Sequence, residues 1–203
     1  MANRAGLGCL GAIVLLVLIA VLGGAGTYNK LVSLDQGVQA QWGQVQNVYQ
    51  RRADLIPNLV QTVKGVANFE KSTYIAVAQA RSKVGQVQGS VPSNVTSDPQ
   101  GLAKFQAAQD GLSSALSRLL VVVERYPELK ANENFLELQS QLEGTENRIA
   151  VERMRYNQVA QSFNTTRQSF PTAIYAGFFG DRFKPKVYFQ AQPGAANVPK
   201  VQF

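Results

Sequence analysis

The chain of 203 residues has the length of one ordinary domain; it is 45% hydrophobic and 16% charged, with a formal net charge of +7. It contains no histidine and a single cysteine, Cys9, which excludes histidine-based acid–base catalysis, serine–histidine and cysteine–histidine nucleophiles, and an intramolecular disulfide. The basic excess suits an anionic membrane surface or an acidic partner, but we favour ordinary solubility charge, because the basic residues are not gathered into one tail.

The first predicted element is a membrane anchor over residues 1–29. No charged residue lies between Arg4 and Lys30, and the centre of this stretch consists mainly of Leu, Val, Ile and Ala. Residues 7–27 are therefore long and apolar enough to cross a bilayer as one helix. A cleaved signal peptide is the alternative, because the residues before Thr27 are small enough for a cleavage site. We expect the segment to be retained.

The charges beside the anchor predict its orientation. Arg4 and the amino terminus flank one side, while Lys30, offset by Asp35, flanks the other. The positive-inside rule therefore favours a cytoplasmic N-terminus, a single membrane pass and a domain outside the cytoplasm. Small residues four apart in the anchor would let a second helix approach closely. These residues are Gly8 with Ala12, and Ala20 with Gly24.

Two apolar ladders predict long helices over residues 31–66 and 135–170. Both repeat every seven residues, which is the period of helices that wind around a partner at a shallow angle. Each helix would be roughly 55 Å long. The inward positions are Leu31, Leu34, Val38, Gln41, Val45, Val48, Arg52, Leu55, Leu59, Thr62 and Val66 in the first ladder, and Phe135, Leu138, Leu142, Thr145, Ile149, Glu152, Tyr156, Val159, Phe163, Thr166 and Phe170 in the second.

Two shorter helices are predicted between the ladders, over residues 69–87 and 102–126. Residues 89–99 contain two prolines and several small residues, which indicate a loop. Four helices with short connections predict an all-α fold. A single N-terminal transmembrane helix is followed, over residues 30–171, by an antiparallel up-down four-helix bundle whose first and last helices are long and coiled-coil-like.

Several blocks of the sequence together resemble the LemA family. The resemblance covers nearly the whole chain, and it implies a membrane-anchored antiparallel four-helix bundle of the bacterial inner membrane. It implies no particular biochemical activity. It is carried by Tyr28-Asn29, Leu31-Val32, Trp42 and the block Gln50-Arg-Arg-Ala-Asp-Leu-Ile-Pro-Asn-Leu-Val60, and in the second half by Glu146-Asn147, Ile149, Arg153, Tyr156-Asn157, Val159, Phe163-Asn164, Phe170-Pro171 and Tyr188-Phe189.

The sequence offers no convincing catalytic or metal site. Glu133 with Glu137, and Glu143 with Glu146, place carboxylate pairs on one face of a helix. A di-metal bundle would also need Glu-x-x-His motifs, and the chain has no histidine. No glycine-rich phosphate loop and no RNA-binding aromatic motif occurs. We therefore expect no enzymatic activity, no metal, no cofactor and no nucleic-acid partner.

Two charged residues occupy inward positions of the ladders. If the long helices run antiparallel with Leu31 level with Phe170, then Arg52 lies level with residue 149, within a turn of Glu152. We predict that Arg52 and Glu152 form a buried polar pair, in contact or separated by one bridging residue. The alternative is that each side chain extends past its neighbours to water.

Residues 172–203 are predicted to be an aromatic and basic tail, extended and close to the membrane. The fourth helix returns antiparallel to the first, so its end should arrive near the bilayer, where rings lie among acyl-chain ends and cations meet lipid phosphates. Alternatively, the aromatics cap the bundle core or contact a neighbouring copy. The candidate residues are Ile174, Tyr175, Phe178, Phe179, Arg182, Phe183 and Lys184.

The leading functional hypothesis is a non-enzymatic membrane scaffold. Such a protein would homo-oligomerise in the lipid and organise other membrane proteins or the local membrane shape. The alternative is an adaptor or regulatory subunit for one membrane partner, such as a protease or a transporter. The size of the purified particle separates the two hypotheses.

Overall fold

The computed structural model describes residues 2–66, 70–92 and 94–190, with side chains from residue 11 onward. Within these ranges the chain forms six α-helices and two short 3-10 helices, and no strand. The all-α prediction is therefore confirmed for the part of the chain that the structure describes.

The longest element is α1, which spans Ala2–Lys64 and contains 63 residues. It joins the predicted anchor and the predicted first long helix into one helix, and it continues through Pro57. At the usual rise per residue it is about 95 Å long. All side chains of residues 11–22 are exposed. In the described residues, this is the one helix long and apolar enough to cross a membrane, with a mean hydropathy of 2.1 over an 18-residue stretch.

Three further helices match the predicted ones to within a few residues: α2 (Lys71–Gly89), α3 (Pro99–Val123) and α5 (Glu133–Gln168). Side-chain caps define two of their starts. Asp98 accepts a hydrogen bond from the backbone N–H of Gln100, and Asn132 accepts one from that of Phe135. Such caps satisfy amide groups that have no partner within the helix. The remaining short elements were not predicted: η1 (Val95–Ser97), α4 (Pro127–Lys130), α6 (Thr172–Phe178) and η2 (Gly180–Phe183).

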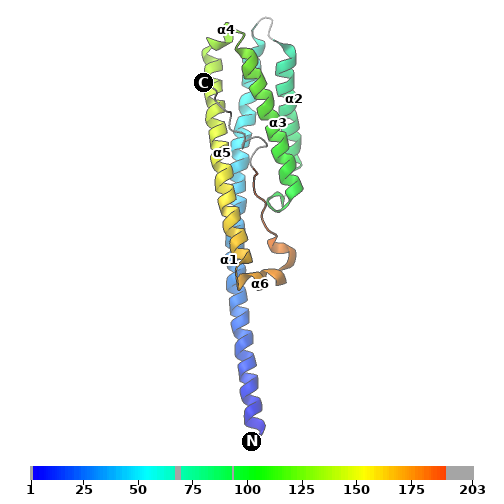
Figure 1. The fold of residues 1–203 in the computed structure, drawn as a ribbon, viewed down its shortest axis with the longest axis vertical. Helices are drawn as coiled ribbons and strands as arrows, with labels where there is room; N and C mark the ends of the chain where they lie inside the picture. The colour runs from blue at the N-terminus through cyan, green and yellow to red at the C-terminus, as the bar shows by residue number, and fades with distance from the viewer. Residues whose placement is uncertain (1, 67–69, 93, 191–203) are drawn as a thin grey trace, which may run out of the picture.

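The helices pack along the part of α1 that lies beyond the anchor. α1 packs against α5 and α2, and α2 packs against α3. The contacts between α1 and α5 run in opposite order along the two helices: the rings of Trp42 and Tyr156 lie 5.9 Å apart, and ten residues later in α1 the guanidinium of Arg52 lies 2.7 Å from the carboxylate of Glu146, ten residues earlier in α5. In Figure 1, α1, α2, α3 and α5 lie side by side in the upper half, and the anchor extends alone below them. We call the packed part the helical body.

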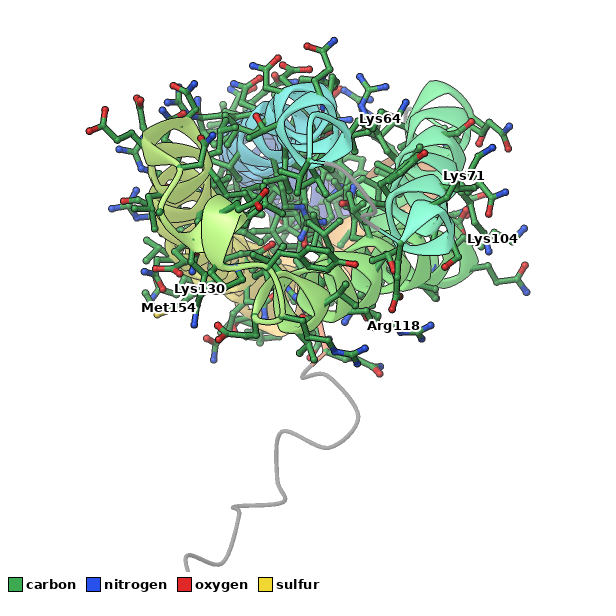
Figure 2. The ribbon with its side chains drawn as sticks, turned by 90° about the horizontal axis from the view of Figure 1, so that it is seen from above. Lys64, Lys71, Lys104, Arg118, Lys130 and Met154 are labelled. Atoms are coloured by element: carbon green, nitrogen blue, oxygen red, sulfur yellow. The ribbon has the colours of Figure 1, made fainter. Side chains whose placement is uncertain are left out.

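The core of the helical body has two halves of different composition. The half near the anchor is rich in aromatic residues, including Trp42, Phe105 and Tyr156. The half farther from the anchor is mainly aliphatic, including Leu59 and Leu112. Most basic side chains lie at the surface of the body, whereas Arg52 and Lys186 are buried. Figure 2, viewed along the long axis, shows Lys64, Lys71, Lys104 and Arg118 projecting from several sides of the body, so these cations do not form one basic face.

We expect the full chain to stay with membranes after high-salt and alkaline washing, because the exposed apolar length of α1 loses its favourable environment in water. Fractionation followed by immunoblotting measures this. Recovery of a soluble form that begins near Thr27 would contradict it.

Candidate functional site where the anchor meets the helical body

The short helix α6 lies against the N-terminal part of α1 that is predicted to be the membrane anchor. Its residue Tyr175 packs on Gly23 and Gly24 of α1: a Cβ atom built on Gly23 would lie 3.0 Å from the tyrosine hydroxyl oxygen, and one built on Gly24 would lie 3.3 Å from the ring. Both distances are shorter than ordinary van der Waals contact, so the absence of side chains at these positions is what admits Tyr175. In Figure 1, α6 crosses beside α1 at the base of the helical body.

This contact occupies one of the four small anchor residues that we expected to face another helix. Gly24 is covered by the chain's own Tyr175, whereas Ala12 and Ala20 are exposed. The surroundings of Gly8 lie outside the described side chains. Close approach at Gly24 is therefore used within the chain, and Ala12 and Ala20 stay available to another helix.

The candidate aromatic residues separate into exposed and buried ones. Phe178 and Ile174 are 84% and 54% exposed. In contrast, Phe183 is fully buried and packs edge-on against Tyr28, at 5.5 Å between ring centroids. Phe179 contacts the same tyrosine ring at 5.2 Å. Phe183 thus closes the anchor end of the core, while α6 presents an uncovered apolar face.

Between the anchor and α6 lies an open apolar groove of about 570 Å³. Its walls include Val17, Val21, Tyr28 and Phe178. The two candidate cations lie next in the chain. Arg182 and Lys184 are both exposed, and the Lys184 ammonium lies 3.3 Å from the Asp181 carboxylate. The groove is continuous with the anchor surface, and basic groups follow it towards the helical body.

The chain then turns away from the anchor. Gly180, with φ of 55°, begins this turn, a conformation that residues with side chains rarely adopt. Residues 184–190, which we call the strap, run back along α5, and in Figure 1 they rise between the helices. Here the structure differs from the expected membrane-proximal tail: Lys186 and Phe189 are only 6% exposed.

Two asparagines of α5 bind the backbone of the strap. The Asn164 side chain accepts from the backbone N–H of Lys186 at 2.7 Å and donates to its carbonyl at 2.8 Å. Asn157, seven residues earlier, makes the same pair of bonds with Phe189, at 2.9 and 3.1 Å. The side chains thus satisfy the backbone polar groups of a buried segment that forms no sheet.

The side chains of the strap are held as well. The Lys186 ammonium lies 2.5 Å from the carboxylate of Asp35, and both residues are buried. Phe189 stacks on Trp42 at 6.0 Å between ring centroids. The Arg153 guanidinium lies 4.8 Å from the Phe189 ring and donates to the carbonyl of Gln190 at 2.8 Å. The strap therefore joins α1, α5 and the aromatic half of the core.

Tyr156 also binds the strap, donating from its hydroxyl to the Val187 carbonyl at 3.1 Å. Burial, together with the nearby hydroxyl of Tyr188, raises the pKa of Tyr156 above its usual value of 10.0. The hydroxyl therefore stays protonated and remains a donor at neutral pH. Since the pKa is raised in the folded state, this contribution to stability is complete below pH 10.0 and falls as the pH rises through the folded pKa.

The predicted buried pair is arranged differently. Arg52 is 1% exposed, as an inward position requires. However, its guanidinium binds the carboxylate of Glu146 at 2.7 Å, the Ser113 hydroxyl at 2.9 Å and the side-chain oxygen of Gln109. Glu152 instead accepts from Gln41 at 2.6 Å and from Arg155 at 2.7 Å. Arg52 is level with Glu146 rather than with residue 149, so the facing helix is displaced by three residues.

In the described residues, no group of three or more acidic, histidine or cysteine side chains is placed to hold a metal ion. Glu143 and Glu146 do line a common groove, but Glu146 is bound to Arg52.

Comparison with known proteins identifies the family of this chain. The LemA family profile matches residues 41–203. The chain belongs to the LemA family. It is 27% identical to magnetosome protein MamQ 2 of Paramagnetospirillum magneticum, over 97% of this chain and 78% of that protein. It is 27% identical to magnetosome protein MamQ of Magnetospirillum gryphiswaldense (85% and 67%), and 26% identical to Protein LemA of Metamycoplasma hominis (74% and 64%).

The strap is the part of this LemA-family chain that sequence reasoning missed. Asn157 and Asn164 had carried the resemblance to the family, but their role was not deduced. Their seven-residue spacing beside the apolar ladder was the available signal, because it places two amides on one edge of α5. Asp35 lies one turn after Leu31, and the sequence indicates only its charge beside the predicted anchor.

We expect Phe178 of this LemA-family chain to lie next to lipid. An environment-sensitive fluorophore on Phe178→Cys, in a Cys9→Ser background reconstituted into vesicles, should report an apolar setting. Val121→Cys is the control, because Val121 is 64% exposed and lies near the far end of α3; its fluorophore should report water. Equal, water-like emission from both sites would place α6 away from the bilayer.

Proposed function

We propose that this chain is a single-pass protein of the bacterial inner membrane that acts as a non-enzymatic scaffold. In this proposal the helical body is an antiparallel four-helix bundle outside the cytoplasm. The protein self-associates and organises other membrane proteins or the shape of the membrane. The observation that carries the proposal is the continuity of α1 from the anchor into the body, over Ala2–Lys64.

A continuous helix transmits position and direction from the membrane to the body. A flexible linker would let the body reorient, whereas one helix braced by Tyr175 at Gly23 and Gly24 limits its tilt. Copies that meet in the membrane would therefore present their bodies in a common orientation. That property suits an organising scaffold, and it requires no reactive group.

In this proposal, copies of the chain contact one another at the groove beside the anchor. Val17, Val21 and Phe178 leave an apolar surface uncovered, and the exposed Ala12 and Ala20 would permit close packing of a second anchor. Two relatives are named magnetosome proteins. In this proposal the apolar stretch of α1 holds the assembly at a membrane.

The mass of the particle tests this proposal. We expect light scattering of the full chain in mild detergent, at micromolar protein, to give a multiple of 22.1 kDa. Phe178→Ser should shift the particle towards the monomer. Phe170→Ser is the matched control, since Phe170 is also 84% exposed but does not line the groove.

A monomer for the unaltered chain would contradict the scaffold proposal. A stable one-to-one complex with a single membrane protein, recovered from cross-linked membranes, would favour the adaptor or regulatory subunit instead.

A further inference from the structure

The exposed face of α6 carries only apolar residues. Ile174 and Phe178 are 54% and 84% exposed and lie four residues apart, on one side of the helix. Ala173 and Gly177 are exposed beside them. Phe170, just before the helix, is 84% exposed as well. Contact of such a face with water is unfavourable, so an apolar surroundings for α6 would stabilise the chain.

The attachment of α6 to α1 places this face at one end of the predicted anchor. Tyr175 packs on Gly23 and Gly24, directly after the exposed apolar residues 11–22. In Figure 1, α6 crosses beside α1 at the base of the helical body. With residues 11–22 in the hydrocarbon of a bilayer, as the proposed function has them, α6 lies at the boundary between acyl chains and headgroups. Helices that lie crosswise at this boundary bury an apolar face in it.

The same level of the molecule carries an excess of positive charge. Residues 23–35 and 167–186 contain five cations and two carboxylates. Both carboxylates are already paired with lysines, at 2.5 and 3.3 Å. The other three cations, Lys30, Arg167 and Arg182, have no ion-pair partner in the part of the chain that the structure describes. They are therefore available to an anionic surface.

Two of these cations lie beside Phe183. The Arg167 Nε donates to the Phe183 carbonyl at 2.5 Å, and the Arg182 guanidinium lies 5.8 Å from the Phe183 ring. The same ring packs against Tyr28. Lys30 follows two residues after Tyr28, about 3 Å farther along α1. An apolar helix with cations on its body side matches the order in which a leaflet presents acyl chains and then phosphates.

We propose that the exposed face of α6 inserts into the bilayer boundary beside the predicted anchor, and that Lys30, Arg167 and Arg182 bind the headgroups of anionic phospholipids there. A helix of seven residues is too short to bind a membrane strongly by itself, but its attachment to α1 keeps it at the surface at a high effective concentration. This inference rests on the proposed membrane anchor and not on self-association, because each copy makes these contacts alone.

Quenching by lipids with brominated acyl chains tests the apolar contact. The full chain, in a Cys9→Ser background, is labelled with an environment-sensitive fluorophore on Ile174→Cys and reconstituted into phosphatidylcholine vesicles that contain phosphatidylglycerol. Met154→Cys is the matched control, because Met154 is also 54% exposed but lies fourteen residues before the end of α5, about 21 Å along the helix. Quenching should be several-fold stronger at the Ile174 site.

The identity of the brominated lipid tests the charge contact. At equal mole fraction, brominated phosphatidylglycerol should quench the Ile174 site on the order of threefold more than brominated phosphatidylcholine, since basic groups attract anionic lipid. Combining Lys30→Gln with Arg182→Gln should bring this ratio close to one. Combining Lys104→Gln with Arg118→Gln removes two exposed cations elsewhere on the body and should leave the ratio unchanged. High salt should abolish the preference but not the quenching itself.

Flotation with the vesicles separates failure of this inference from failure of the anchor. A chain that floats, but whose Ile174 site is quenched no more than its Met154 site, would overturn the inference and leave the scaffold proposal intact. Apolar emission without quenching would also overturn it, because a second copy would then cover α6. Equal quenching by the two lipids would overturn the assignment of the cations. Unchanged emission from Trp42, the single tryptophan, confirms that each variant folds.

Discussion

The Glu146→Gln variant is expected to lose about 3 kcal/mol of unfolding free energy. That value lies at the low end for one partner of a buried ion pair, because the Glu146 side chain is 44% exposed and partly screened by water. The loss arises because the Arg52 guanidinium, 2% exposed, would remain charged without its counter-ion. Urea unfolding followed by the emission of Trp42 measures it.

Glu152→Gln is the control for this variant. Glu152 was the partner expected from the sequence, but its ion pair is with Arg155, whose side chain is 58% exposed. Such a pair contributes at most about 1 kcal/mol. A larger loss for Glu152→Gln than for Glu146→Gln would mean that the charge of Arg52 is balanced by Glu152 after all.

Lys186→Met should destabilise the helical body by about 3–5 kcal/mol, because it leaves the Asp35 carboxylate buried without its counter-charge. Asp35→Asn should have a similar effect, since it leaves the Lys186 ammonium buried without a counter-charge. Combining the two changes should cost less than the sum of the single losses, because neither charge is then left alone. Urea unfolding gives the energies, and a red shift of Trp42 emission would report that Phe189 has left its ring.

Lys184→Met is the matched control, two residues away in the same segment. The ion pair of Lys184 with Asp181 is exposed on both sides, at 52% and 89%, so its removal should change stability little. If the two lysine variants were equally stable, the buried ion pair would not be what retains the strap.

Much of the fold follows from periodicity. The predicted positions Leu31, Val38, Val45, Arg52 and Leu59 are all buried. The intervening positions are displaced by one residue: instead of 41, 48, 55 and 62, the buried ones are Trp42, Tyr49, Ile56 and Val63. A strict coiled-coil seam uses a narrow stripe. Because α1 packs against both α5 and α2, its buried face is wider than the stripe of a two-helix coiled coil. The centre of that face also differs from the predicted one.

The partner of Arg52 could not be predicted, because a seven-residue repeat does not determine how far two helices are displaced along their axis. The predicted alignment, which places Leu31 at the same height as Phe170, requires the second ladder to be buried as far as its last residue. In the structure α5 ends at Gln168 and Phe170 is 84% exposed. The strap was missed for a related reason: its contacts with Asp35 and Trp42 join residues more than a hundred positions apart, and its hydrogen bonds to α5 join residues 22 to 37 positions apart. These separations exceed the reach of a helical repeat.

The strap also bears on the order in which the protein can fold during synthesis. Trp42 is made early and Phe189 late, yet their rings stack in the finished core. The predicted anchor therefore leaves the ribosome while the aromatic half of the body still lacks the strap that completes it. Contacts of such long sequence separation form slowly, so this half of the core stays open until residue 190 has emerged. The newly made chain is thus most vulnerable to proteases and to wrong partners at the end of the body that adjoins the predicted anchor.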